Sequence, residues 1–142
     1  MDGNPDDPTL KDLLTRYRRV AVVGFSKDPT KEAHSVPLIL KQRGYHVIPV
    51  NPTATEIAGM RVHSSLKAVP EDYDIVDIFR PGEAVGPIVD EAIEHGKAKV
   101  IWMQLGITNE AAAAKARAAG LVVVQDRCMK RETTRLLGFA DA

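Results

Sequence analysis

A short turn near the start of the chain has the residue types that bind phosphate. The run VAVVGF (residues 20–25) has the apolar, β-branched composition of a buried strand, and GFSKDPTKEAHS (24–35) leads from it into a helix. Gly24 lets a ligand approach the backbone, Ser26 offers a hydroxyl, and Lys27 offers a positive charge. The free N–H groups of a helix start also favour an anion. These residues suit an anion site, but the turn alone slightly favours a plain strand-to-helix loop with a solvated lysine.

The turn does not have the pattern of the common dinucleotide and triphosphate sites. A turn that binds NAD or FAD reads G-x-G-x-x-G, and an acidic residue for the ribose follows about 20 residues later. Here the turn reads G-x-S-x-x-P, and the strand YHVIPV (45–50) is followed by Asn51 and Pro52. No GKS or GKT occurs, so a Walker loop is absent. The missing acid argues against NAD but leaves NADP open.

Cys128 is the only thiol and the main candidate for covalent chemistry. It follows an apolar run at 121–126, near an expected helix start, among Arg127, Lys130 and Arg131. Basic neighbours and a helix start are features of reactive thiolates. We favour the alternative interpretation, in which Cys128 is a small, partly buried residue that packs the loop. A single cysteine allows no disulfide within the chain.

The other titratable residues do not form a recognisable site. The histidines at 34, 46, 63 and 95 lack ligand spacing, and no CxxC or HxxxH occurs, so we expect no metal. Asp74 and Asp77 flank one apolar strand with an offset of three residues, which places them on opposite faces. We therefore expect no acid–base pair from these two carboxylates.

Five apolar strands alternate with helices along the chain. Strands are expected at 20–25, 45–50, 74–79, 99–105 and 121–126, and helices between or after them at 33–43, 83–95, 109–119 and 130–137. This alternation implies a parallel sheet with helices on both faces. The predicted fold class is α/β, a doubly wound Rossmann-like sheet of five strands. With the strands numbered in chain order, we predict the order 3-2-1-4-5.

The remainder of the chain fits one small domain. We expect a flexible leader at 1–8 and a single domain at 9–142, with Thr9 capping a first helix and Asp12 completing a capping box. The 19 basic and 19 acidic residues balance, and no basic stripe argues for nucleic acid. No apolar run approaches the ~18 residues of a membrane helix. The acidic start MDGNPDDPTL is unlike a signal peptide, so we expect a cytoplasmic protein.

Five stretches, in their order and spacing, resemble a known family. They are VAVVGFSKDPTKEAHSVP, GYHVIPVNP, DIVDIFRP, WMQLGI and VVVQDRC, within residues 10–137. Together they resemble the small stand-alone CoA-binding proteins of the YccU-like family. That family is similar to the CoA-binding domain of the succinyl-CoA synthetase alpha subunit. The resemblance implies a Rossmann-like domain that binds coenzyme A at the carboxyl ends of its strands.

The resemblance also implies which residues contact CoA. Carried over by position, the phosphates would be held by Gly24, Phe25, Ser26 and Lys27, and the adenosine would be flanked by Asn51 and Pro52. Phe79 and Arg80 would line the cleft beside the first strand, and Gln104 and Gly106 would face the pantetheine. The synthetase domain with the phosphorylated histidine has no counterpart here, so we expect no ligase activity. We expect a non-enzymatic protein that binds CoA or acyl-CoA. The alternatives are an acyl-CoA or thiol-redox enzyme that uses Cys128, or a protein that binds a nucleotide of the NADP type. The sequence leaves open whether the chain has a protein partner or forms a homo-oligomer.

Overall fold

Five short runs of apolar and β-branched residues form one sheet. In the computed structural model, which describes residues 3–141, all five strands run parallel. They are β1 (Arg19–Val23), β2 (His46–Val50), β5 (Ile75–Ile78), β6 (Val100–Met103) and β7 (Val122–Val124). Every residue of β5 and β6 is buried, as expected for strands that are covered on both faces.

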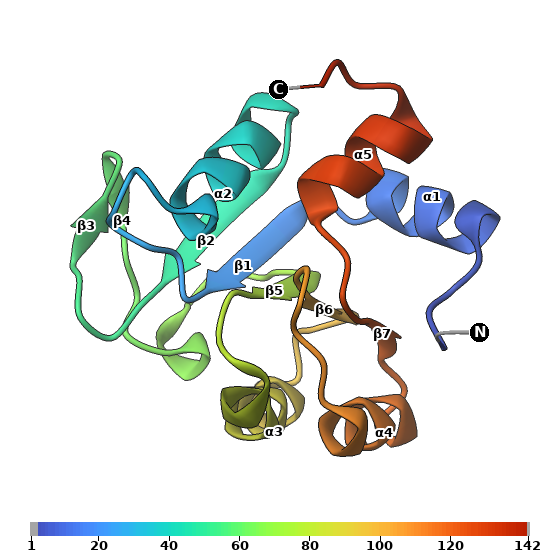
Figure 1. Ribbon diagram of the computed structural model, residues 1–142. Helices are drawn as coiled ribbons and strands as arrows, with labels where there is room; N and C mark the ends of the chain where they lie inside the picture. The colour runs from blue at the N-terminus through green and yellow to red at the C-terminus, as the bar shows by residue number, and fades with distance from the viewer. Residues whose placement is uncertain (1–2, 142) are drawn as a thin grey trace.

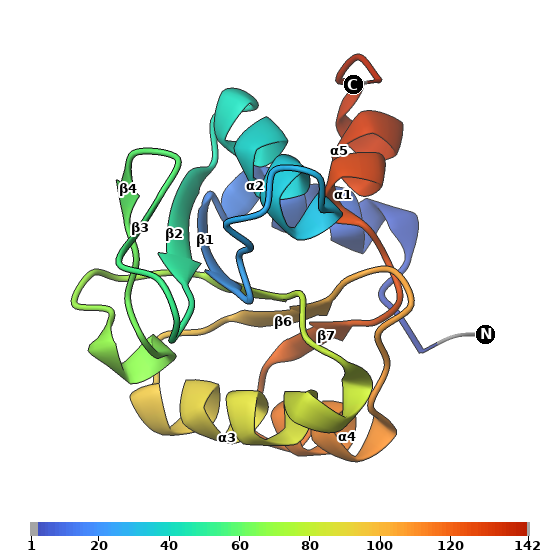
Figure 2. The same ribbon diagram turned by 60° about the vertical axis from the view of Figure 1, so that its left-hand side comes forward.

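Helices cover both faces of the sheet (Figures 1 and 2). The helices α1 (Asp7–Arg16), α2 (Glu32–Gln42) and α5 (Met129–Leu137) pack on one face, and α3 (Val85–His95) and α4 (Glu110–Ala118) on the other. Two short 3-10 helices, η1 (Leu66–Ala68) and η2 (Gly82–Ala84), and a hairpin of β3 (Glu56–Ile57) and β4 (Met60–Arg61) complete the fold. The predicted doubly wound α/β fold is confirmed. None of the helices within residues 3–141 is long and apolar enough to cross a membrane.

The predicted strand order is wrong. The sheet runs β2-β1-β5-β6-β7, so the third strand in the chain lies on the far side of the first rather than outside the second. Pro49 explains why β2 is an edge strand, because proline has no N–H for a further neighbour. Its carbonyl points away from β1 and accepts from the N–H of His63 at 3.0 Å. The order consequently reverses between β1 and β5.

The amino-terminal segment also differs from expectation. The N-cap of α1 is Asp6, whose carboxylate accepts a hydrogen bond from the Thr9 N–H at 3.0 Å, so Thr9 lies inside the helix. The side chain of Asn4 bonds both the N–H and the carbonyl of Gln125, at 2.7 and 2.8 Å. The expected leader at 1–8 is therefore packed on the domain from Asn4 onward, and its first two residues lie outside the described part of the chain.

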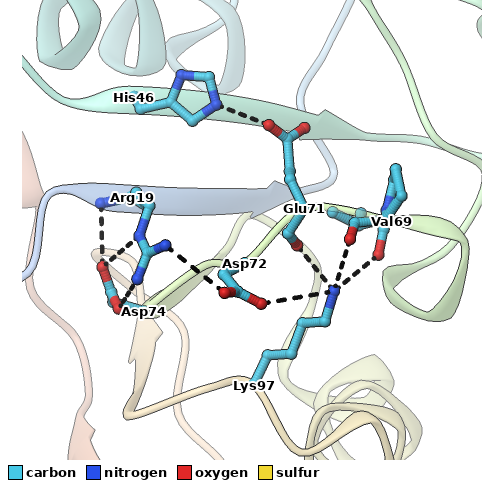
Figure 3. Close-up of polar contacts among 8 residues, drawn as sticks. Arg19, His46, Val69, Glu71, Asp72, Asp74 and Lys97 are labelled. Carbon is cyan, nitrogen blue, oxygen red and sulfur yellow. Dashed lines mark hydrogen bonds and ion pairs between the residues drawn. The ribbon is translucent and has the colours of Figure 1, made fainter.

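Ion pairs and hydrogen bonds hold the amino end of β5 beside β1 (Figure 3). The guanidinium of Arg19 forms two hydrogen bonds with the carboxylate of Asp74, at 3.0 and 3.2 Å. Lys97 donates to the three carbonyls of residues 69–71, at 2.9 to 3.3 Å. These contacts fasten the long connection that brings the chain from β2 across to the other side of β1, and they leave the carboxyl ends of the strands open.

Candidate functional site

The main cleft opens at the carboxyl ends of β1 and β5, where the strand order reverses. Its volume is about 710 Å³, and residues from β1, β2, α2 and α3 and from the segments that follow β1, β2 and β5 line it. This volume is within the range of roughly 300–1,000 Å³ that is typical of small-molecule sites. Ligands of doubly wound sheets bind at such a reversal point. The fold therefore places this cleft where a ligand is expected.

The close approach of two strand ends forms part of this cleft. Gly24 has a φ of +89°, and a Cβ built on it would lie 2.8 Å from the carbonyl oxygen of Phe79 and 3.1 Å from the Cδ of Arg80. The N–H of Gly24 donates to the carbonyl of Val50 at 3.0 Å. Only glycine fits this conformation and this contact. The carboxyl ends of β1, β2 and β5 are therefore joined next to the cleft by contacts between backbone atoms rather than between side chains.

A proline in α2 fixes the turn after β1. Pro37 has no N–H to offer the carbonyl of Ala33 four residues earlier, and that carbonyl accepts instead from the N–H of Ser26 at 3.0 Å. The hydroxyl of Ser26 accepts from the Asp28 N–H at 3.0 Å, and Nδ1 of His34 donates to the carbonyl of Ser26 at 2.7 Å. The Ser26 backbone is thus fully used within the turn, and its hydroxyl proton is the group that can still bind a ligand.

The start of α2 brings positive charge to the cleft. Lys31 is the N-cap residue and provides no side-chain cap, and the N–H groups of Glu32 and Ala33 have no acceptor within residues 3–141. Lys31 and Arg80 both line the cleft, and neither forms an ion pair with a described residue. The helix dipole adds to these two charges. The arrangement can bind an anion such as a phosphate group.

Most of the residues predicted from the sequence meet in this cleft. The lining includes Gly24, Ser26, Asn51, Pro52, Phe79 and Arg80. The amide of Asn51 donates to the carbonyl of Phe25 at 2.8 Å, and its oxygen accepts from the N–H and the hydroxyl of Thr53, both at 2.8 Å. Asn51 therefore holds the end of β2 against the turn after β1.

Four of the predicted residues lie elsewhere. Phe25 is fully buried and packs edge-on to the ring of His34, so that only its backbone is near the cleft. Lys27 is exposed and lies outside the lining. Gln104 is buried under the sheet end, and the Gly106 N–H is bonded to a carboxylate of the next loop at 2.6 Å. The end of β6 is therefore separate from this cleft.

Other lining residues were not predicted. Lys31 is four residues after Lys27 in the loop, and only the helix start at residue 32 makes it the cation beside the α2 N-terminus. Ser64 and Ser65 come from the irregular link after β2, and Ile88 and Glu91 come from α3, three residues apart on one helix face. The spacing of Ile88 and Glu91 is visible in the sequence, but no sequence pattern indicates which face of α3 lines the cleft.

A buried carboxyl lies in the sheet on the side of α1, α2 and α5. Asp77 is completely buried, and loss of hydration raises its pKa from 3.8 to about 7. Gln104 donates to its Oδ1 at 2.7 Å, whereas Oδ2 has no partner among the described residues. Asp77 and Asp74 do not converge, as expected, since Asp74 is bonded to Arg19. We assign Asp77 to the core rather than to the cleft.

Cys128 does not line the cleft. It is the N-cap residue of α5, is 6% exposed, and packs in the core on the same face as α1 and α2. Within residues 3–141, no group of three or more His, Cys, Asp or Glu side chains is arranged to hold a metal ion. The cleft thus offers hydroxyls, two cations and the carboxylate of Glu91.

Comparison with known proteins places this geometry in a family. Residues 18–134 match a family model described as a CoA binding domain. The protein YneT of Bacillus subtilis strain 168, itself uncharacterized, is 39% identical over 127 residues, which are 89% of this chain and 93% of that protein. The structure of a hypothetical protein from Pyrococcus horikoshii OT3 matches with a TM-score of 0.92 and 39% identity, over 96% of this chain and 95% of that chain.

A larger relative contains the same region. The alpha subunit of the ADP-forming acetate–CoA ligase II of Pyrococcus furiosus is 32% identical over 98 residues. The match covers 68% of this chain and 21% of the subunit, so this chain spans about a fifth of that relative.

Proposed function

Because this chain belongs to the CoA-binding domain family, we propose that its cleft binds coenzyme A, free or acylated. One observation carries the proposal. Lys31, Arg80 and the unbonded N–H groups at the start of α2 meet around a cleft at the point where the strand order reverses. CoA carries several phosphate charges, and such groups bind phosphate through charge-assisted hydrogen bonds.

The turn after β1 supports the same assignment. Gly24 brings the backbone close to the ligand position, and Ser26 retains a hydroxyl proton that can be donated to a phosphate oxygen. The resemblance assigns the phosphates to Lys27, whereas the lining of the cleft favours Lys31. Both lysines are therefore candidates, and a binding experiment separates them.

We infer that the domain holds CoA without transforming it. The ligase relative is named for a reaction, but this chain matches only about a fifth of that subunit. The alternative of a thiol enzyme needs Cys128 at the ligand, and that residue is 6% exposed and outside the lining. Gln104 and Gly106, assigned to the pantetheine by the resemblance, also lie outside the lining. They would contact CoA only if its pantetheine arm ran past the cleft toward the end of β6.

Calorimetric titration tests the proposal. Wild type is titrated with CoA, acetyl-CoA, NAD and NADP, together with the variants Lys31→Ala, Arg80→Ala, Lys27→Ala and Lys41→Ala. We expect CoA or acetyl-CoA to bind best, and the loss of Lys31 or Arg80 to weaken binding about 10-fold. Lys41→Ala, at the far end of α2, is the matched control and should bind like wild type.

The outcomes separate the alternatives. Weaker binding in Lys27→Ala but not in Lys31→Ala would support the residue assigned by the resemblance. Preference for NADP, or absence of CoA binding by wild type, would contradict the proposed function. If the protein turned over an acyl-CoA and Cys128→Ser abolished this turnover, the protein would be a thiol enzyme rather than a binding protein.

A further inference from the structure

One carboxylate lies in the proposed CoA cleft without a cation to pair with. Glu91 comes from α3, is partly buried, and lines the cleft. Its Oε1 accepts from the N–H of Leu66 at 3.1 Å, which leaves Oε2 available. The two neighbouring acids of α3 are paired: Asp90 with Lys115 and Glu94 with Lys67. Glu91 forms no ion pair with any residue between 3 and 141.

This carboxylate gives the cleft two electrically different ends. Lys31 belongs to α2 and Glu91 to α3, and these helices cover opposite faces of the sheet (Figure 2). A phosphate is attracted to the α2 side, and a negative side chain repels it on the α3 side. The part of the ligand beside Glu91 must therefore carry no negative charge and must donate hydrogen bonds.

The walls around Glu91 suit a flat ring. Ile88 lies on the same face of α3 one turn earlier, and Pro87 precedes it, so an apolar surface adjoins the carboxylate. Ser64 and Ser65 add hydroxyls from the link that follows β2. Apolar side chains with a few polar groups at the edge are typical of a site for a nucleobase.

We propose, resting on the proposed function, that Glu91 selects the base of the ligand. The carboxylate accepts a hydrogen bond from the exocyclic amino group of adenine, and Ile88 and Pro87 pack on the ring. The adenosine then lies between α3 and residues 64–65, and the phosphates lie at Lys31 and Arg80. Glu91 thus acts as a specificity residue that favours an amino-bearing purine and disfavours a negatively charged group in its place.

A comparison of four ligands tests this role. CoA is measured against 1,N6-etheno-CoA, whose adenine has no free amino group, and two fragments, adenosine 3′,5′-bisphosphate and 4′-phosphopantetheine, report on the two halves separately. In Glu91→Gln the side-chain carbonyl can still accept from the Leu66 N–H. Glu94→Gln is the matched control, because Glu94 is on the same helix and outside the lining.

We expect wild type to bind CoA about 10-fold more tightly than etheno-CoA. In Glu91→Gln this preference should shrink to about twofold, with weaker binding of the bisphosphate and unchanged binding of phosphopantetheine. Glu94→Gln should retain the wild-type ratios. Equal affinity of wild type for CoA and etheno-CoA overturns the inference without any variant. Selective loss of phosphopantetheine binding in Glu91→Gln also overturns it, while the proposed function stands. Failure of wild type to bind CoA overturns both.

Discussion

Gly24 and Phe79 approach so closely that a methyl group on Gly24 would lie 2.8 Å from the carbonyl oxygen of Phe79. This contact joins the carboxyl ends of β1 and β5 at the point where the strand order reverses. Arg80 follows Phe79 and also lies next to Gly24, so the same close approach places Arg80 at the cleft. The packing of the sheet and the shape of the cleft therefore depend on one missing side chain.

Gly24→Ala should destabilise the protein and weaken ligand binding. Alanine is strained at a φ of +89°, and its Cβ would push the backbone of Phe79 away. Together these effects should lower the free energy of unfolding by about 3 kcal/mol, as measured by urea denaturation. Gly86→Ala is the matched control, because Gly86 is helical and has open space around its Cβ position, and it should stabilise α3 by up to ~1 kcal/mol. Equal stability of the two variants would disprove the role of the contact.

Pro37→Ala should loosen the turn after β1. The new N–H at position 37 would compete for the carbonyl of Ala33, which now accepts from Ser26. We expect amide hydrogen exchange at Ser26 to accelerate and CoA affinity to fall, although the helix itself loses an unfavourable residue. Pro29→Ala, in the exposed part of the same turn, is the control. An unchanged exchange rate at Ser26 in Pro37→Ala would show that the proline is not needed to hold the turn.

Asp77 should make the protein less stable as the pH rises from about 4 to about 7. Its pKa rises from 3.8 to about 7 on folding, so in this range the folded state holds a proton that the unfolded chain has lost. The contribution of protonated Asp77 to the free energy of unfolding is fully present below pH 3.8 and is lost as the pH rises through about 7. At 1.36 kcal/mol for each pH unit, the loss amounts to about 4 kcal/mol.

The variant Asp77→Asn removes this charge and keeps the shape of the side chain. Its free energy of unfolding should vary less between pH 5 and pH 8 than that of wild type, by roughly 3 kcal/mol. Urea denaturation at several pH values provides the comparison. Asp6 and Asp28, whose carboxyl pKa values are lowered by hydrogen bonds, are present in both proteins, so their contributions cancel in the comparison. Parallel pH profiles would show that Asp77 does not titrate in the core.

The helices and strands were predicted from the sequence far better than the order of the strands in the sheet. Strand and helix periodicity are local, and the strand predicted at 45–50 and the helix predicted at 83–95 occur within a few residues of their expected bounds. The side of β1 on which the third strand lies is not local. Only Pro49, which suits an edge strand, contradicted the predicted order, and its missing N–H was the signal that could have corrected it.

The candidate site was predicted where it depends on strand ends and missed where it depends on helix faces. Gly24 directly follows β1 and Arg80 is the second residue after β5, so topology brings them together. Lys27 and Lys31 are four residues apart in the loop before α2, and the exact start of α2 decides which one lines the cleft. Glu91 lines the cleft because the segment around Leu66 approaches α3, a contact between distant parts of the chain that no local pattern records.

The outer edges of the sheet have a consequence for assembly. At one edge, Pro49 offers no N–H to an incoming strand, and the backbone of His63 already occupies its carbonyl. At the other edge, the amide of Asn4 imitates a neighbouring strand by bonding both backbone groups of Gln125. Unprotected edges invite chains to join edge to edge and aggregate. The ladder is interrupted on both sides here, which disfavours extension of the sheet by a second molecule.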